Sequence, residues 1–147
     1  MSLKERLMED LKVSMKNKET VRKNTITMVR AAIKQIEVDT RKDVSEEQIL
    51  EIMTKQVKEK RFAIGEFKKG SREDLVNLTE SEIGFLLEYL PKQLTEEEVE
   101  EIVIETIKEI NATSMKDIGS IMKAVMPKVK GKTDGNIVNK VVKKIFS

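Results

Sequence analysis

The sequence contains no cysteine, no histidine and no tryptophan. Without cysteine there is no disulfide, no thiol nucleophile and no thiolate metal ligand. Without histidine, imidazole acid–base catalysis, histidine-containing triads and histidine-ligated metals are excluded. These absences remove the commonest arrangements for catalysis and metal binding. We therefore predict no catalytic residues, no metal site and no cofactor.

Aromatic residues make up only 3% of the chain, which has six glycines and two prolines in 147 residues. A chain that is poor in both strand formers and helix breakers favours α-helices. The longest run without a charged residue is six residues. We therefore expect no membrane-spanning segment, no signal-peptide core and a cytoplasmic protein.

The net charge of +2 hides a strong segregation of charge along the chain. Residues 1–36 carry nine basic and four acidic side chains, and residues 37–91 carry nine and thirteen. Residues 92–110 carry two basic and seven acidic side chains, whereas residues 111–147 carry eight lysines and two aspartates. A small basic unit thus follows directly on an acidic helix, which favours a polyanionic partner such as nucleic acid.

Apolar residues recur at helical spacing in seven segments, and no segment alternates as a strand does. Three helix starts have the pattern of a capping box: Ser2–Glu5, Ser45–Gln48 and Thr95–Glu98. Gly70 is expected to end the third helix with a positive φ, and Pro91 breaks the fourth helix. We predict an all-α fold, with four long helices in residues 1–91 and a small three-helix domain in residues 92–147.

The loop before the last helix is the main candidate for binding phosphate. Three alternate lysines precede it, and the backbone N–H groups of residues 134–136 should point outward at a helix N-terminus. Asp134 places a negative charge at the mouth of this site. We expect one continuous positive face on the last three helices. The predicted nucleic-acid-binding residues are Lys123, Lys128, Lys130, Gly131, Lys132, Gly135, Asn136, Lys140, Lys143 and Lys144.

Residues Gly131–Thr133 look like the end of a nucleotide-binding phosphate loop, but the wider pattern is missing. That motif needs a glycine where this chain has Met126, and a strand where this chain has a helical pattern. The alternative is a tight connection between two helices, with Gly131 as the C-terminal cap of the first.

Three other features have simpler interpretations as structure. A second basic set between residues 12 and 34 is interrupted by acidic residues, which favours a solvated surface. The glutamates at 96–98 and 100–101 are explained by a capped helix start better than by a metal or catalytic site. Most methionines fall in or beside apolar stripes and are interpreted as core residues.

Seven short segments, in order and spread over the whole chain, resemble the YqeY family of small bacterial proteins. They are SLKERL (2–7), MVRAAIK (28–34), GSREDL (70–75), LEYLPKQL (87–94), MKDIG (115–119), KGKTDG (130–135) and VN (138–139). The carboxyl-terminal part is similar to the tail domain of the B subunit of the glutamine-dependent aminoacyl-tRNA amidotransferase.

The resemblance implies an all-helical, two-part protein whose tail binds RNA. In the amidotransferase the tail contacts the tRNA body, while another domain uses ATP and a separate subunit releases ammonia from glutamine. This chain has no Ser–Ser–Lys set in a glycine- and serine-rich setting and no phosphate loop. We therefore predict no turnover by this chain alone, although the family is associated with carbon–nitrogen ligase activity that uses glutamine as the amide donor.

Two functions from different classes remain open at this point. The first is a non-catalytic module that binds RNA, with tRNA as the expected partner. The second is a helical adaptor for a protein partner, favoured by the dense apolar segment Ile83–Leu90, which has more apolar residues than one helix face needs. Neither function requires a membrane.

Overall fold

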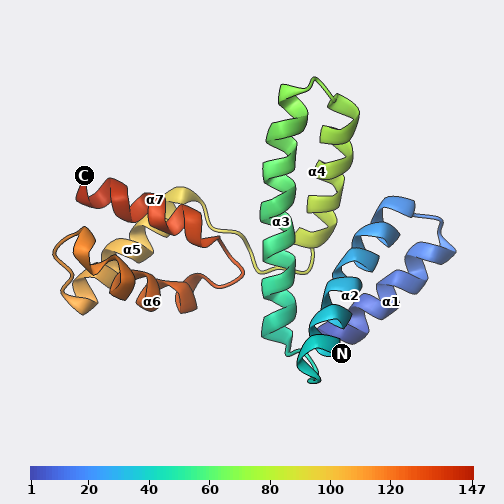
Figure 1. The fold of residues 1–147 in the computed structure, drawn as a ribbon, viewed down its shortest axis with the longest axis horizontal. Coiled ribbons are helices and arrows are strands. Elements are labelled where there is room, and N and C mark those ends of the chain that lie inside the picture. The colour runs from blue at the N-terminus through green and yellow to red at the C-terminus, as the bar shows by residue number, and fades with distance from the viewer. The chain divides into compact units, whose positions relative to one another are not determined.

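A computed structural model describes all 147 residues and contains helices but no strands (Figure 1). The helices are α1 (Leu3–Lys16), α2 (Thr20–Thr40), α3 (Glu46–Lys69), α4 (Glu73–Leu87), α5 (Glu96–Ile110), α6 (Ile118–Val129) and α7 (Gly135–Phe146), with one 3₁₀ turn at Met115–Asp117. The predicted all-α class is confirmed. The chain divides into two compact units, Met1–Leu90 and Pro91–Ser147.

The amino-terminal unit consists of two helical hairpins, α1–α2 and α3–α4 (Figure 1). Helix α2 also packs against α3 and α4, and α1 packs against α3. The shared core contains aliphatic residues from all four helices, among them Leu7, Ile26, Met53 and Leu86, each at most 1% exposed. The second hairpin is therefore joined to the first by hydrophobic burial.

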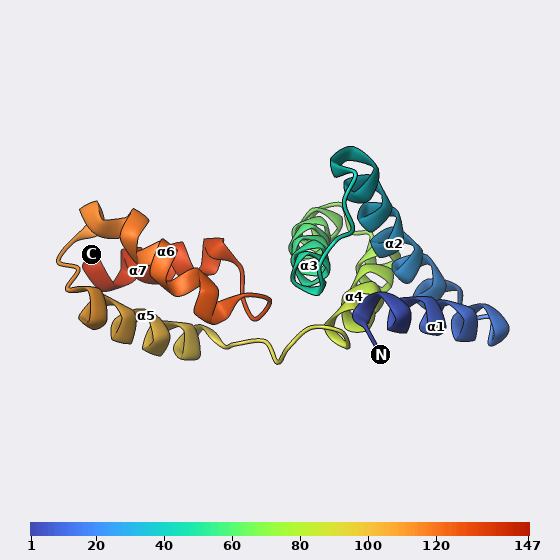
Figure 2. The same cartoon turned by 90° about the horizontal axis from the view of Figure 1, so that it is seen from below.

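The carboxyl-terminal unit packs α5, α6 and α7 against one another around a separate core (Figure 2). That core is built almost entirely from β-branched side chains, and eight of them have no exposed area. They are Val99, Val103, Ile121, Val125, Val129, Val138, Val141 and Val142. Each helix contributes at least two of them, so no single helix could bury its apolar face alone.

No helix of the chain is both long enough and apolar enough to cross a bilayer.

Two of the three predicted capping boxes form, at Ser45–Gln48 and Thr95–Glu98. At the start of α1 only half of the pattern is present, because Ser2 accepts a hydrogen bond from the Glu5 N–H without a return bond. The Leu3 N–H instead donates to the Glu46 carboxylate at 2.8 Å. A tertiary contact with the start of α3 thus satisfies the amino end of α1.

The prediction that Gly70 has a positive φ is wrong. Gly70 has φ −88°, and Ser71 has φ +55°. The Arg72 N–H reaches the Phe67 carbonyl at 2.9 Å, and the Ser71 N–H reaches that of Lys68 at 3.1 Å. This is the hydrogen-bond pattern of a Schellman motif whose left-handed position falls one residue after the glycine.

The apolar segment at the end of α4 is used inside the amino-terminal unit. Ile83, Leu86, Tyr89 and Leu90 are all buried in its core. Phe85 is partly buried, and its ring lies 4.4 Å from the Arg22 guanidinium carbon. Most of this apolar segment is therefore buried within its own unit, so the density of apolar residues that favoured an adaptor has an internal explanation.

The interpretation of the methionines as core residues is wrong for three of them. Met8, Met15 and Met28 are 37%, 59% and 48% exposed. They lie on the solvent-facing sides of α1 and α2, whose opposite sides pack into the core of the unit.

Candidate functional site

Three of the predicted RNA-binding lysines form ion pairs with the acidic helix α5. Lys128 Nζ lies 2.9 Å from Glu109 Oε2 and also donates to the Thr106 hydroxyl at 2.9 Å. On α7, the ion pairs are Lys140–Glu96 at 3.7 Å and Lys144–Glu100 at 3.5 Å. The prediction of one continuous positive face is therefore wrong, because glutamates of α5 interrupt it at three points.

The other predicted lysines differ in exposure. Lys123 on α6 and Lys143 on α7 are exposed and form no ion pair. Lys132, in the loop between these helices, also forms no ion pair. The side chains of Lys130 and Lys132 are both partly exposed. Lys123, Lys132 and Lys143 are thus the predicted cations that no acidic side chain of the chain neutralises.

Gly131 is buried and shapes the loop between α6 and α7. Its φ of +75° suits glycine, and its carbonyl accepts a hydrogen bond from Gln93 Nε2 at 2.7 Å. The Leu94 N–H donates to the Lys132 carbonyl at 2.9 Å, which fixes the loop to the segment before α5. Gly131 is therefore a structural residue, and the prediction that it lets a ligand approach is wrong. The interpretation as a tight connection between helices is confirmed.

Asp134 occupies the anion site predicted at the start of α7. One oxygen of its carboxylate, Oδ1, accepts the N–H groups of Asn136 at 2.8 Å and Ile137 at 3.1 Å. The Asn136 N–H is therefore not available to a phosphate. Gly135, the first residue of α7, lies close to the Met122 side chain. The side-chain oxygen of Asn139, one turn further along α7, is buried without a hydrogen-bond partner. A site that depends on the bare amino end of α7 is excluded.

Replacing Asp134 by alanine should lower the free energy of unfolding of the carboxyl-terminal unit by about 1 kcal/mol, because a helix N-cap is lost. Urea denaturation followed by far-UV circular dichroism measures the change. Asp134→Asn, which keeps an oxygen able to accept both N–H groups, is the matched control. An equal loss of stability in both variants would show that the carboxylate charge matters rather than the cap.

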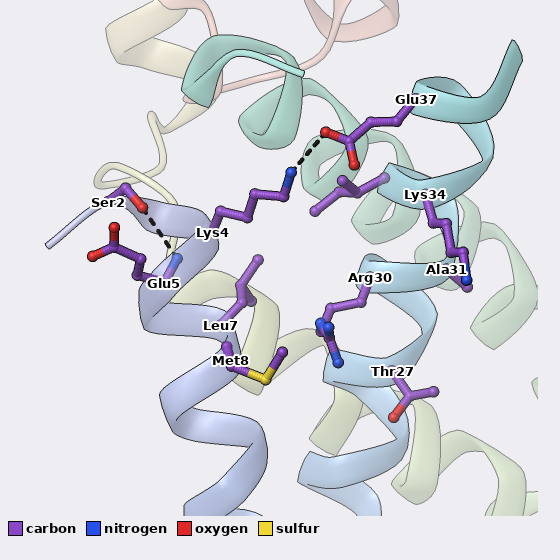
Figure 3. Close-up of a pocket in the computed structure, with 11 residues that line it drawn as sticks. Ser2, Lys4, Glu5, Leu7, Met8, Thr27, Arg30, Ala31, Lys34 and Glu37 are labelled. Atoms are coloured by element: carbon purple, nitrogen blue, oxygen red, sulfur yellow. Dashed lines mark hydrogen bonds and ion pairs between the residues drawn. The ribbon is translucent and has the colours of Figure 1, made fainter. Parts of the chain in front are cut away.

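A groove between α1 and α2 was not predicted as a site. Its volume is about 770 Å³, and Figure 3 shows Met8 of α1 pointing toward Thr27 and Arg30 of α2. The residues that line it are Ser2, Lys4, Glu5, Leu7, Met8, Thr27, Arg30, Ala31, Ile33, Lys34 and Glu37. Arg30 and Lys34 form no ion pair, so this groove has cations that face solvent.

Glu37 closes one end of the groove. It forms an ion pair with Lys4 at 2.7 Å and accepts the Val44 N–H at 3.1 Å (Figure 3). The hydrogen bond from Lys4, followed by that from the Val44 backbone, lowers the pKa of the Glu37 carboxyl. Glu37 is thus held in its ionised form by residues of the fold.

A smaller hollow of about 360 Å³ lies where α1 turns into α2. Ser14, Met15, Lys18, Thr20 and Lys23 line it. Neither lysine forms an ion pair. In the sequence, the excess of positive charge in residues 1–36 is the feature that could have pointed to these two basic hollows.

A family model described as Yqey-like protein matches residues 4–146, which is nearly the whole chain. The chain belongs to the YqeY-like family.

Among curated YqeY-like relatives, two fungal proteins named "Altered inheritance of mitochondria protein 41, mitochondrial" are similar to this chain. The protein of Kluyveromyces lactis is 35% identical over 71% of this chain and 58% of its own length. That of Pyrenophora tritici-repentis is 27% identical over 95% of this chain and 78% of its own length. The chain thus spans little more than half of the first relative.

In this YqeY-like chain the only tyrosine is part of the packing between α1 and the end of α4. The buried Tyr89 hydroxyl donates a hydrogen bond to the Asp10 carboxylate, and the Arg6 guanidinium carbon lies 4.6 Å from the ring centre. Burial, and then the bond to Asp10, raises the pKa of the Tyr89 phenol. Tyr89 therefore stays protonated and acts as a structural hydrogen-bond donor.

Arg22 makes a second connection to the end of α4. It pairs with Glu88 at 2.9 Å and with Glu19 at 2.9 Å. Glu19 thus pairs with Arg22, and Asp10 accepts a hydrogen bond from Tyr89. The sequence had suggested that both carboxylates neutralise nearby lysines. Of the basic set on α1 and α2, Arg22 is the member that forms ion pairs, and none of the four carboxylates in residues 1–36 pairs with a lysine of the set.

Proposed function

We propose that this chain is an RNA-binding module, with tRNA as its ligand, and that it catalyses no reaction by itself. The observation that carries the proposal concerns the acidic residues of the last 37 positions. Only Asp117 and Asp134 are acidic there, and both accept backbone N–H groups, from Thr113 and from the start of α7. Within the carboxyl-terminal unit, α5 is therefore the helix whose carboxylates pair with the lysines of this segment, at Lys128, Lys140 and Lys144.

The ion pairs with α5 still leave these lysines able to bind phosphate. The side chains of Lys140 and Glu96 are 73% and 46% exposed, and those of Lys144 and Glu100 are 64% and 33% exposed. Exposed ion pairs of this kind contribute about 0–1 kcal/mol to the free energy of unfolding, and they weaken as the salt concentration rises. An RNA backbone can therefore replace the glutamates, while Lys123, Lys132 and Lys143 bind without this competition.

The lack of an exposed aromatic ring in the carboxyl-terminal unit favours helical RNA over single strands as the ligand of this unit. Phe146 is the only aromatic residue in the carboxyl-terminal unit, and it packs against the core. Single-stranded nucleic acid is usually bound by stacking its bases on aromatic side chains. Double-helical RNA is recognised through its shape, phosphates and 2′-hydroxyls, which lysines can contact. The helical arms of tRNA fit this chemistry.

The test is a titration of fluorescently labelled tRNA with the intact chain and with Lys123, Lys132 and Lys143 changed to glutamine. The slope of log K against log salt should fall by about 2–3, since each phosphate contact contributes roughly 0.7–0.9. At low salt the affinity should fall about tenfold or more. Glutamine keeps most of the aliphatic stem, so the fold should be retained.

A matched control removes three cations from α3, by changing Lys58, Arg61 and Lys68 to glutamine. All three are exposed and lie outside the carboxyl-terminal unit. Absence of tRNA binding by the intact chain at low salt would contradict the proposal. An equal loss of affinity in the α3 variant would show that only net charge matters, which would also contradict it.

A further inference from the structure

The α1–α2 hairpin has an unusual set of cations without acidic partners. Lys4, Arg6 and Arg22 form ion pairs within the amino-terminal unit. Six further cations of the same hairpin form none. They are Lys12, Lys16, Lys18, Lys23, Arg30 and Lys34. The acidic side chains of residues 1–36 that form ion pairs do so with other cations, Asp10 with Arg6 and Glu19 with Arg22.

Helical geometry places three of these cations on one side of α2. Lys23, Arg30 and Lys34 are spaced by seven and four residues, which returns to the same face, and they span about 16 Å along the axis. Arg30 and Lys34 line the larger groove, and Lys23 lines the hollow at the hairpin turn. On α1, Met8 and Met15 are also seven residues apart and line the same two hollows.

The chemistry of this surface fits a phosphate backbone better than an apolar partner. The two large aliphatic residues of the groove, Leu7 and Ile33, are 1% and 3% exposed and belong to the core. An amphipathic helix or a membrane surface would need contiguous apolar area to bury. Apart from Met8 and Ala31, the exposed side chains of the groove are charged or polar. They are Lys4, Glu5, Thr27 and Lys34, and Arg30 and Glu37 are partly exposed.

We infer that the α1–α2 groove is a second binding surface for the phosphodiester backbone of RNA. The inference rests on the proposed function for the identity of the ligand, but the groove uses different residues on a different unit. Arg30 and Lys34 contact phosphates at the groove, and Lys23 contacts them at the hairpin turn. Both units of one chain then contact RNA. Because the two units are joined covalently, the overall affinity for RNA is higher than that of either unit alone.

The experiment compares three variants of the full chain in titrations of labelled tRNA at several salt concentrations. The first changes Lys23, Arg30 and Lys34 to glutamine, the second is the carboxyl-terminal variant with Lys123, Lys132 and Lys143 changed to glutamine, and the third is the α3 control described above. We expect the groove variant to weaken binding about tenfold and to lower the salt slope by about 2–3, with the α3 control near the intact chain.

The fold of each variant is checked by far-UV circular dichroism and by the fluorescence of Tyr89, which lies in the same unit as the groove. Lys34→Glu is a second groove variant at an exposed position, and it should weaken tRNA binding without loss of structure. Vesicles of phosphatidylglycerol serve as a different anionic surface in the same titration.

The outcomes separate this inference from the proposed function. If the carboxyl-terminal variant loses affinity and the groove variants do not, the groove inference is wrong and the proposed function stands. If only the groove variants lose affinity, the groove binds RNA and the site assigned to the carboxyl-terminal unit is wrong. If the groove variants lose binding to vesicles but keep binding to tRNA, the groove serves a lipid surface and the inference is overturned.

Discussion

Changing Leu86 to alanine is expected to lower the free energy of unfolding of the amino-terminal unit by about 2–5 kcal/mol. Leu86 lies on α4, is 1% exposed and packs in the core shared by α1–α4. The cost combines the lost burial of the side chain with the cavity that close-packed neighbours cannot fill. The carboxyl-terminal unit has a separate core, so its stability should change little.

The chain provides a built-in reporter for this experiment. Tyr89 is the only tyrosine and there is no tryptophan, so intrinsic fluorescence follows the amino-terminal unit alone. Far-UV circular dichroism follows the helices of both units. In urea, the midpoint of the Tyr89 fluorescence transition of Leu86→Ala should move to a lower urea concentration. The part of the circular dichroism transition that comes from the carboxyl-terminal unit should keep its midpoint. Leu78→Ala, on the same helix but 42% exposed, is the control and should change little.

Changing Val138 to aspartate should unfold the carboxyl-terminal unit. Val138 has no exposed area and lies in the core formed by α5, α6 and α7. A buried carboxylate without a partner costs several kcal/mol, and a unit of about 60 residues has little stability to lose. The signal of three helices should disappear from the circular dichroism spectrum, while the Tyr89 fluorescence transition stays unchanged.

Asn136→Asp is the matched control, since it adds the same charge to α7 at an exposed position near the helix start. It should keep the native spectrum. The unfolded variant also isolates the groove, because tRNA binding that remains should be lost when Lys23, Arg30 and Lys34 are changed as well. A shift of the Tyr89 transition in Val138→Asp would show that the two units do not unfold independently.

Local features of the chain could largely be predicted from its sequence. The serine and glutamine at 45 and 48, and the threonine and glutamate at 95 and 98, form the expected capping boxes. A capping box needs only residues three positions apart, so its partners are always within reach. The predicted cap at Ser2 is only half formed, and the next N–H, that of Leu3, donates to Glu46, which lies 43 positions further along the chain.

The charged surfaces could not be predicted in the same way. Lys140 and Lys144 meet Glu96 and Glu100 because α7 packs against α5, and this pairing connects residues more than forty positions apart. Conversely, Asp10 lies among the lysines of α1 in the sequence, but its carboxylate accepts a hydrogen bond from Tyr89. The sequence thus overestimated the free charge of α7, and it did not show which cations of the α1–α2 hairpin are paired.

The helical class, most helix boundaries and the absence of imidazole and thiol groups could be derived from the amino-acid sequence, because these features depend on local spacing and on which side chains are present. Which cations remain without a partner could not be derived in this way, since it depends on which helix faces pack together. For the RNA binding proposed above, the helix packing therefore selects the candidate surface from a larger number of lysines and arginines.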